Sequence, residues 1–172
     1  MTTSQNGWAT ITPDECRKWI IPGTGRHLIL NPSHAGFVLV WWALFWHHKI
    51  ERIDLGVWDE WGWAQRLISG STTITNHNSG TATDLNATRH PLGVPVEDTF
   101  TPTQLRRIRR RLRLLFGVLR WGGDYVNRPD GMHTEINATP DRVRILAFWL
   151  ARTPRGRHIV KANPGYHPAG RK

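Results

Sequence analysis

The chain is organised around residues 75–86, TNHNSGTATDLN, which contain two potential metal ligands. His77 and Asp84 stand seven positions apart, with Gly80 and Ala82 between them. Gly80 relieves backbone crowding and Ala82 leaves space beside the ligands, so the pattern predicts a loop that leads into a short strand. An imidazole and a carboxylate that converge on one point suit zinc, but two ligands do not complete a site.

The third ligand is predicted in residues 130–135, DGMHTE, where His133 is accompanied by carboxylates. Cys16 is the only cysteine, so any metal must be held by histidines and carboxylates. His77, Asp84 and His133 would leave one tetrahedral position open, which is typical of a catalytic zinc site. Zinc in an open site makes water reactive at neutral pH, so a metal-dependent hydrolase is indicated.

A hydrolase of this kind also needs a carboxylate that takes a proton from water and passes it to the leaving amine. Asp130, three residues before His133, is the first candidate for this base. Glu135 is the rival, because residues i and i+2 of a strand share a face, and Asp124 is a third candidate. Arg66 could bind a substrate carboxylate or stabilise the oxyanion, or it could be an ordinary surface arginine.

Composition limits the class of protein. The 172 residues carry 23 Lys and Arg against 13 Asp and Glu, a formal net charge of +10 that favours an anionic partner such as nucleic acid, a membrane surface or a cell-wall polymer. Ten tryptophans indicate a bulky aromatic core or an aromatic-lined cleft. The polar N-terminus lacks the features of a secretory signal, and the apolar stretch 36–46 is too short to span a bilayer.

Helices and short strands without a βαβ rhythm predict an α+β fold, with helices packed on a small antiparallel sheet. We expect one domain over residues 1–152 and a basic, Pro/Gly-rich C-terminal tail over residues 153–172, as a loose arm. Four helices are predicted. The first is opened by residues 12–15 and ended by 22–25, a central one runs from Ser33 to about His48, and the last runs from Thr139 to about Ala151. The remaining helix follows Thr101, and one of its faces is apolar, with Leu105, Ile108, Leu112, Leu115 and Leu119. The predicted strands are 50–55, part of 58–68, and 132–136.

The motifs resemble a known family. Residues 75–84 follow T-x-H-x-x-G-x-A-x-D, which is similar to the S-x-H-x-x-G-x-A-x-D signature of the zinc D-alanyl-D-alanine carboxypeptidases. That group includes vancomycin-resistance dipeptidases and phage endolysins that are L-alanyl-D-glutamate endopeptidases. Its second motif, Glu/Asp-x-x-His, appears at 130–133, and WGGDY at 121–125 resembles the Trp-Gly-Gly-Asp-Trp segment of endolysin-type members. Thr75 keeps the hydroxyl of the usual Ser, whereas Asp130 is shorter than the Glu of many members.

The resemblance covers about residues 61–137. It implies a D-Ala-D-Ala carboxypeptidase/hedgehog-like fold, one Zn²⁺ held by His77, Asp84 and His133, Asp130 as the base and Arg66 as the substrate-facing arginine. The implied activity is hydrolysis of peptidoglycan stem peptides in bacterial cell-wall lysis. Endolysin-like features favour the L-alanyl-D-glutamate bond, and removal of a terminal D-Ala is the alternative. We expect a monomer without membrane insertion that stays in the host bacterial cytoplasm until a holin releases it to the wall.

Two other classes stay open. The arginines between Arg106 and Arg113 could neutralise phosphates, although no nucleic-acid-binding motif accompanies them and a solvated helix face explains them adequately. The protein could also be a non-catalytic wall-binding module with a structural zinc. Replacing Asp130 separates these cases, because a catalyst should lose turnover but keep its metal.

Overall fold

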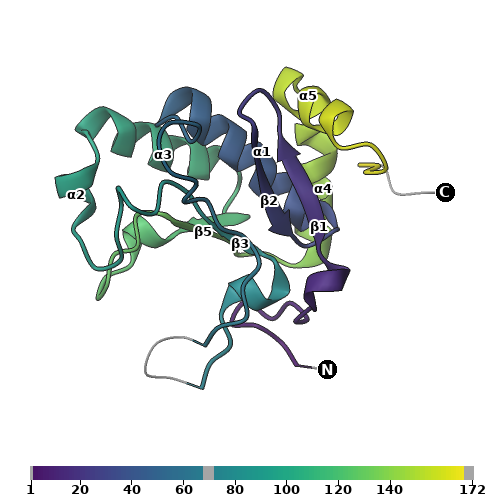
Figure 1. Ribbon diagram of the computed structural model, residues 1–172, viewed down its shortest axis with the longest axis horizontal. Coiled ribbons are helices and arrows are strands. Elements are labelled where there is room, and N and C mark those ends of the chain that lie inside the picture. Colours follow the sequence, from purple (N-terminus) through teal and green to yellow (C-terminus); the bar gives the residue numbers. More distant parts are fainter. Residues whose placement is uncertain (1, 68–71, 169–172) are drawn as a thin grey trace.

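The computed structural model describes residues 2–67 and 72–168, and it has the predicted α+β architecture (Figure 1). Two antiparallel sheets are present in the described part, one with the order β1-β2 and one with the order β3-β5-β4. The strands are β1 (Arg17–Ile21), β2 (Arg26–Leu30), β3 (Ala82–Asp84), β4 (Leu119–Trp121) and β5 (His133–Ile136), and the α-helices are α1 (His34–Lys49), α2 (Val96–Thr99), α3 (Pro102–Leu114), α4 (Pro140–Leu150) and α5 (Pro154–Ala162).

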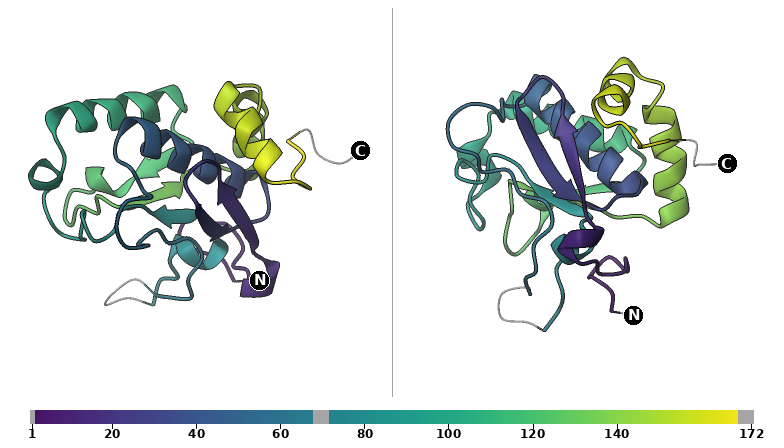
Figure 2. Two further views of the ribbon diagram at one scale, coloured as in Figure 1. Left: turned by 45° about the horizontal axis from the view of Figure 1, so that its top comes forward. Right: turned by 45° about the vertical axis from the view of Figure 1, so that its right-hand side comes forward.

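Helix α1 is the centre of the molecule, as its apolar sequence predicts. It contacts the β1–β2 hairpin, strand β5 and helices α4 and α5, so it is covered on several sides (Figures 1 and 2). Its residues from Ala35 to His47 are buried. Two indoles fix it to the segments that carry the candidate ligands, because Trp42 Nε1 donates to the Thr134 hydroxyl at 3.0 Å and Trp46 Nε1 donates to Asn86 Oδ1 at 2.9 Å.

The three-stranded sheet positions the candidate site. In the β3–β5 ladder Asp84 stands opposite His133, and directly opposed residues of an antiparallel pair share one face of the sheet. The loop before β3 ends at Gly80, whose φ is +62°, and a Cβ there would approach the Asn31 nitrogen to 2.4 Å. Gly80 therefore serves both the left-handed turn and a close backbone approach.

The first predicted helix is wrong. Residues Pro13–Glu15 form only a 3₁₀ turn, and the chain then enters strand β1, which pairs with β2 in a hairpin. The predicted capping box at Thr12 is present, but alternation decides the continuation, because Trp19 and Ile21 point inward between exposed residues. Residues 22–25 make the hairpin turn instead of ending a helix.

The strand predicted at 50–55 is also wrong, since this segment is irregular and bends from residue 53 onward. Arg52 and Asp54 pair with each other there rather than with a neighbouring strand. Between 58 and 67 the chain makes only isolated bridges, Trp61 with Asp84 and Leu67 with Ile74, while Ile68 lies outside the described residues. The bridge between Trp61 and Asp84 nevertheless extends the sheet beside β3.

Helix α3 is shorter than predicted. It ends at Leu114, and the positive φ values of Phe116 and Gly117 turn the chain so that Leu119 begins strand β4 rather than extending the apolar helix face. The helix predicted from Thr139 is confirmed as α4, and the strand predicted at 132–136 is confirmed as β5.

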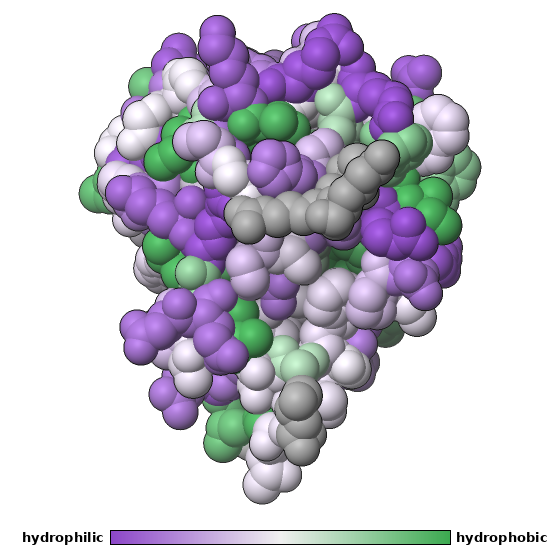
Figure 3. Space-filling view, turned by 90° about the vertical axis from the view of Figure 1, so that its right-hand side faces the viewer, coloured by the Kyte–Doolittle hydropathy of each residue, from purple (hydrophilic) through white to green (hydrophobic). Residues whose placement is uncertain are grey.

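The loose arm predicted from residue 153 is wrong over α5. The Thr153 side chain accepts a hydrogen bond from the Gly156 N–H, and Ile159 is fully buried where α5 packs against α1 and β1. Figure 3 looks onto the side that carries α4 and α5, where hydrophilic side chains surround separate hydrophobic ones. Residues 169–172 lie outside the described part. No helix among the described residues has both the length and the apolar character needed to cross a membrane.

One carboxyl group is buried in the segment that runs beside β3. Glu60 is 4% exposed, and the closest cation to its carboxylate is Arg26, whose Nε lies 3.7 Å away. Burial and the neighbouring charge of Asp59 raise the pKa of Glu60 to about 7, and Arg26 offsets only part of this. The ionised form of Glu60 therefore destabilises the folded protein.

We expect Glu60→Gln to remove a pH dependence of stability. The unfolded chain loses this proton near its ordinary pKa of 4.5 and the folded protein only near 7, so the unfolding free energy of the wild type falls as pH rises between these values. At pH 8 the variant should be more stable by on the order of 2–3 kcal/mol. Urea unfolding at pH 5 and pH 8 measures this, with the exposed Glu97→Gln as control. An identical pH dependence in both variants would contradict the prediction.

Candidate metal centre

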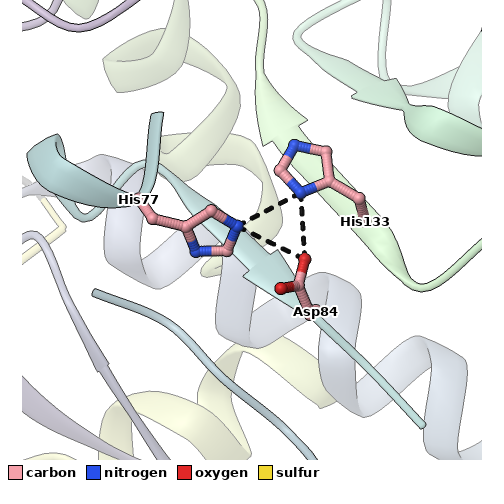
Figure 4. A group of neighbouring side chains, drawn as sticks. All are labelled: His77, Asp84 and His133. Carbon is pink, nitrogen blue, oxygen red and sulfur yellow. Dashed lines mark hydrogen bonds and ion pairs between the residues drawn. The ribbon is translucent and has the colours of Figure 1, made fainter. Parts of the chain in front are cut away.

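Three side chains converge from three different elements (Figure 4). His77 lies in the 3₁₀ turn Asn76–Ser79, Asp84 ends β3, and His133 begins β5. His133 Nδ1 is 2.9 Å from Asp84 Oδ1 and 3.2 Å from His77 Nε2, and His77 Nε2 is 3.3 Å from Asp84 Oδ1. All three residues are buried, and one ligand atom from each lies within 4.8 Å of the others.

In each imidazole, the hydrogen bond made by the nitrogen that faces away from the candidate site determines the role of the other nitrogen. His77 Nδ1 lies 2.5 Å from the Gly62 carbonyl oxygen, and His133 Nε2 lies 3.1 Å from Glu135 Oε2. Both outer nitrogens are placed to donate a proton, so in each neutral imidazole the inner nitrogen, His77 Nε2 or His133 Nδ1, is the one that can bind a cation. Together with the Asp84 carboxylate they form three acceptors around one point, an arrangement that a cation satisfies. Two imidazoles and a carboxylate with oriented outer edges fit zinc.

The charges around this point agree with that arrangement. Burial alone would raise the pKa of Asp84, but His77 and His133 outweigh it and hold that pKa well below its usual value. Burial likewise lowers the pKa of His133, but the hydrogen bonds to Asp84 and Glu135 prevail and raise it to about 10. The site therefore attracts positive charge strongly even though it is removed from water.

A second layer of residues surrounds Glu135. Asn76 Nδ2 donates to Glu135 Oε2 at 2.6 Å, Tyr125 bonds to the same carboxylate, and Arg120 Nη1 lies 3.7 Å from Glu135 Oε1. The carboxylate stands at the Nε2 edge of His133, whereas Asp84 faces the Nδ1 edge. Glu135 is thus placed to orient His133.

Sequence reasoning assigned no role to Asn76, Tyr125 or Arg120. The available signal for Asn76 was its place next to His77, and β5 register brings Arg120 opposite Glu135. The only sequence signal for Tyr125 was its place in the WGGDY motif. These residues hold the outer carboxylate, and such partners tune the affinity of a metal site.

Asp130 lines the same cavity as the three candidate ligands, a space of about 470 Å³. Its Oδ1 is buried and has no hydrogen-bond partner among the described residues, and burial raises the pKa of Asp130. The Gly122 turn supports it, because Asp130 N–H donates to the Gly122 carbonyl at 2.9 Å and a Cβ at Gly122 would come within 2.6 Å of the Asp130 carbonyl oxygen. Asp124, in contrast, pairs with Arg109 at 2.9 Å on the surface.

Arg66 stands at the mouth of the cavity. Its Nη2 lies 2.8 Å from Asp84 Oδ2, so one carboxylate meets Arg66 with one oxygen and the two histidines with the other. The backbone of Arg66 is bonded to Thr75 and Asn78 of the ligand loop, and its side chain is 41% exposed. His90, by comparison, is paired with Glu51 away from this cavity.

Comparison with known protein families matches one segment of the chain, which contains the candidate metal ligands. A family model described as D-alanyl-D-alanine carboxypeptidase matches residues 69–136, which include His77, Asp84, Asp130 and His133. No curated protein and no solved structure matches the chain. The matched segment is therefore similar to the D-alanyl-D-alanine carboxypeptidase family, and two histidines and an aspartate converge within it.

Proposed function

We propose that the protein is a zinc-dependent peptidase that hydrolyses stem-peptide bonds of bacterial peptidoglycan. The observation that carries this proposal is one cavity in which three convergent metal-ligand atoms lie with a buried carboxyl group that lacks a partner among the described residues. The family match over the same segment supports the reaction class.

Each residue has a distinct task in this proposal. His77, Asp84 and His133 hold the zinc ion, which when bound supplies a Lewis acid that activates water and polarises a carbonyl group. Asp130 accepts the proton of the attacking water and delivers it to the leaving amine. Arg66, at the cavity mouth, offers its guanidinium to the developing negative charge of the carbonyl oxygen or to a substrate carboxylate.

The favoured bond is the internal L-alanyl-D-glutamate bond, and the WGGDY segment at 121–125 supports this choice. Release of a terminal D-Ala is the alternative. In this proposal a single peptidase domain acts as a monomer, in the manner of a phage endolysin that a holin releases from the host cytoplasm.

Digestion of purified peptidoglycan tests the proposal. We expect soluble fragments from the wild-type protein, none after chelation, and recovery when zinc is added back, because the proton transfers need the activated water. Mass spectrometry of the new termini identifies the bond. A protein that binds one zinc per chain but releases nothing from walls of several bond types would instead be a binding module with a structural ion.

A further inference from the structure

A second hollow adjoins the metal cavity on the other side of Arg66. It has a volume of about 380 Å³, and Arg66 lines both spaces. The second hollow is bordered by His27 and by the segment 58–64, which contributes Trp58, Trp61 and Trp63. We call it the tryptophan hollow.

Strand register ties this hollow to the metal site. Trp61 and Asp84 form a bridge in which Trp61 N–H donates to the Asp84 carbonyl at 3.0 Å and Asp84 N–H donates to the Trp61 carbonyl at 2.8 Å. Asp84 is also opposite His133, so the three side chains share one face of the extended sheet. The carbonyl oxygen of the next residue, Gly62, accepts a hydrogen bond from His77 Nδ1. The segment that lines the hollow is therefore hydrogen-bonded to two of the candidate metal ligands.

The two outer tryptophans of the hollow are left accessible. Trp61 is 50% exposed and Trp58 is 45% exposed, whereas Trp19, Trp42 and Trp46 of the core are fully buried. Exposed indoles in a hollow beside a reaction centre are typical of a surface for a ligand with an apolar face.

The Trp58 ring is also held in place. The guanidinium of Arg26 lies 4.9 Å from the ring centroid, and the His27 ring meets it edge-on at 4.6 Å. Arg26 is fixed in turn by a hydrogen bond from its Nε to the Ile53 carbonyl at 3.1 Å. A ring that is ordered before binding loses little freedom when a ligand stacks on it.

We infer that the tryptophan hollow binds a pyranose ring of the glycan strand, namely the N-acetylated amino sugar that carries the stem peptide. This inference rests on the proposed function. The C–H face of a pyranose is apolar and packs on indole, while its hydroxyl rim meets polar groups such as His27 at the edge of the hollow.

The position of the hollow then selects the bond. The first stem residue is joined directly to the lactyl group of that sugar, and one residue spans at most about 3.6 Å. Arg66 contacts the candidate ligand Asp84 at 2.8 Å, so a sugar held next to Arg66 places the bond after the first residue nearer the metal centre than the terminal D-Ala, which lies several residues further along. The hollow therefore favours cleavage at the sugar-proximal bond.

The test compares two soluble substrates of the zinc-loaded protein, the complete stem peptide attached to its disaccharide and the same peptide without sugar. We expect the kcat/KM of the glycan-bearing substrate to exceed that of the free peptide by about tenfold, the order of one aromatic contact. Trp61→Ala, and separately Trp58→Ala, should bring this ratio towards one. The control is Trp149→Ala, which removes another exposed indole, on α4 and outside the hollow, and should keep the wild-type ratio.

A binding measurement separates failure of the hollow from failure of the peptidase. The wall disaccharide alone is titrated into the zinc-loaded protein while the indole N–H signals are followed by NMR. Saturable shifts that Trp61→Ala abolishes support the hollow even if neither peptide is cleaved, an outcome that would remove only the proposed reaction. Equal kcat/KM values for both substrates together with no disaccharide binding would overturn the inference. Indole N–H shifts produced by the free peptide instead of the disaccharide would assign the hollow to the peptide and would overturn the inference as well.

Discussion

Asp130→Asn is expected to lower kcat on peptidoglycan by about 10²–10⁴-fold while the zinc content stays at one ion per chain. The amide has nearly the same shape as the carboxylate but cannot accept the proton of water. Asp130 lies in the cavity but contributes none of the three convergent ligand atoms, so the variant should still bind zinc. Wall digestion and metal analysis on the same preparation measure both quantities.

The matched control for this variant is Asp124→Asn. Asp124 stands in the Gly122–Asp124 turn that supports Asp130, but its carboxylate pairs with Arg109 and is half exposed. It should therefore keep wild-type turnover. Equal losses in the two variants would point to the turn rather than to proton transfer, and full activity of Asp130→Asn would remove Asp130 from the mechanism.

Asp84→Asn is expected to weaken zinc binding by more than about 100-fold, beyond the 10–100-fold that loss of an outer partner costs. The change removes the only negative charge among the three convergent ligands, and it also releases Arg66 from the oxygen that it contacts. Competition with a chromophoric chelator measures the affinity.

The surface variant Asp98→Asn, on α2, controls for a general change of charge. Activity of Asp84→Asn should fall in parallel with zinc occupancy. Zinc affinity equal to that of the wild type would show that the carboxylate is not a ligand.

The candidate ligands were predictable because each lies in a short motif whose residue types are unusual together. His77 and Asp84 are separated by small residues only, and the structure brings them to His133 through one strand pair. The sequence could not indicate which ring nitrogen faces the ion. That choice is made by Gly62 and Glu135, which approach from elements distant in the chain.

The errors in the fold share a physical cause. The capping box at Thr12 was interpreted as the start of a helix, and it does form, but hairpin pairing with β2 outweighs helix propagation. Alternation at 50–55 predicts a strand, yet within the described part of the chain no strand pairs with those residues. Composition predicts a loose tail, although the Thr153 cap and the buried residues Gly156 and Ile159 hold α5 in place. Local pattern decides such segments only where tertiary partners agree with it.

The spacing of the ligands along the chain has a further consequence for the energetics of the protein. Asp84 and His133 are 49 positions apart, and the chain between them carries α2, α3 and β4. An ion shared by these two residues acts as a cross-link that closes a long loop, and it takes conformational entropy from the unfolded chain. If the proposed zinc site is occupied in this way, metal supply would govern the lifetime of the folded protein as well as its chemistry, and a metal-starved molecule would be more readily degraded by proteases.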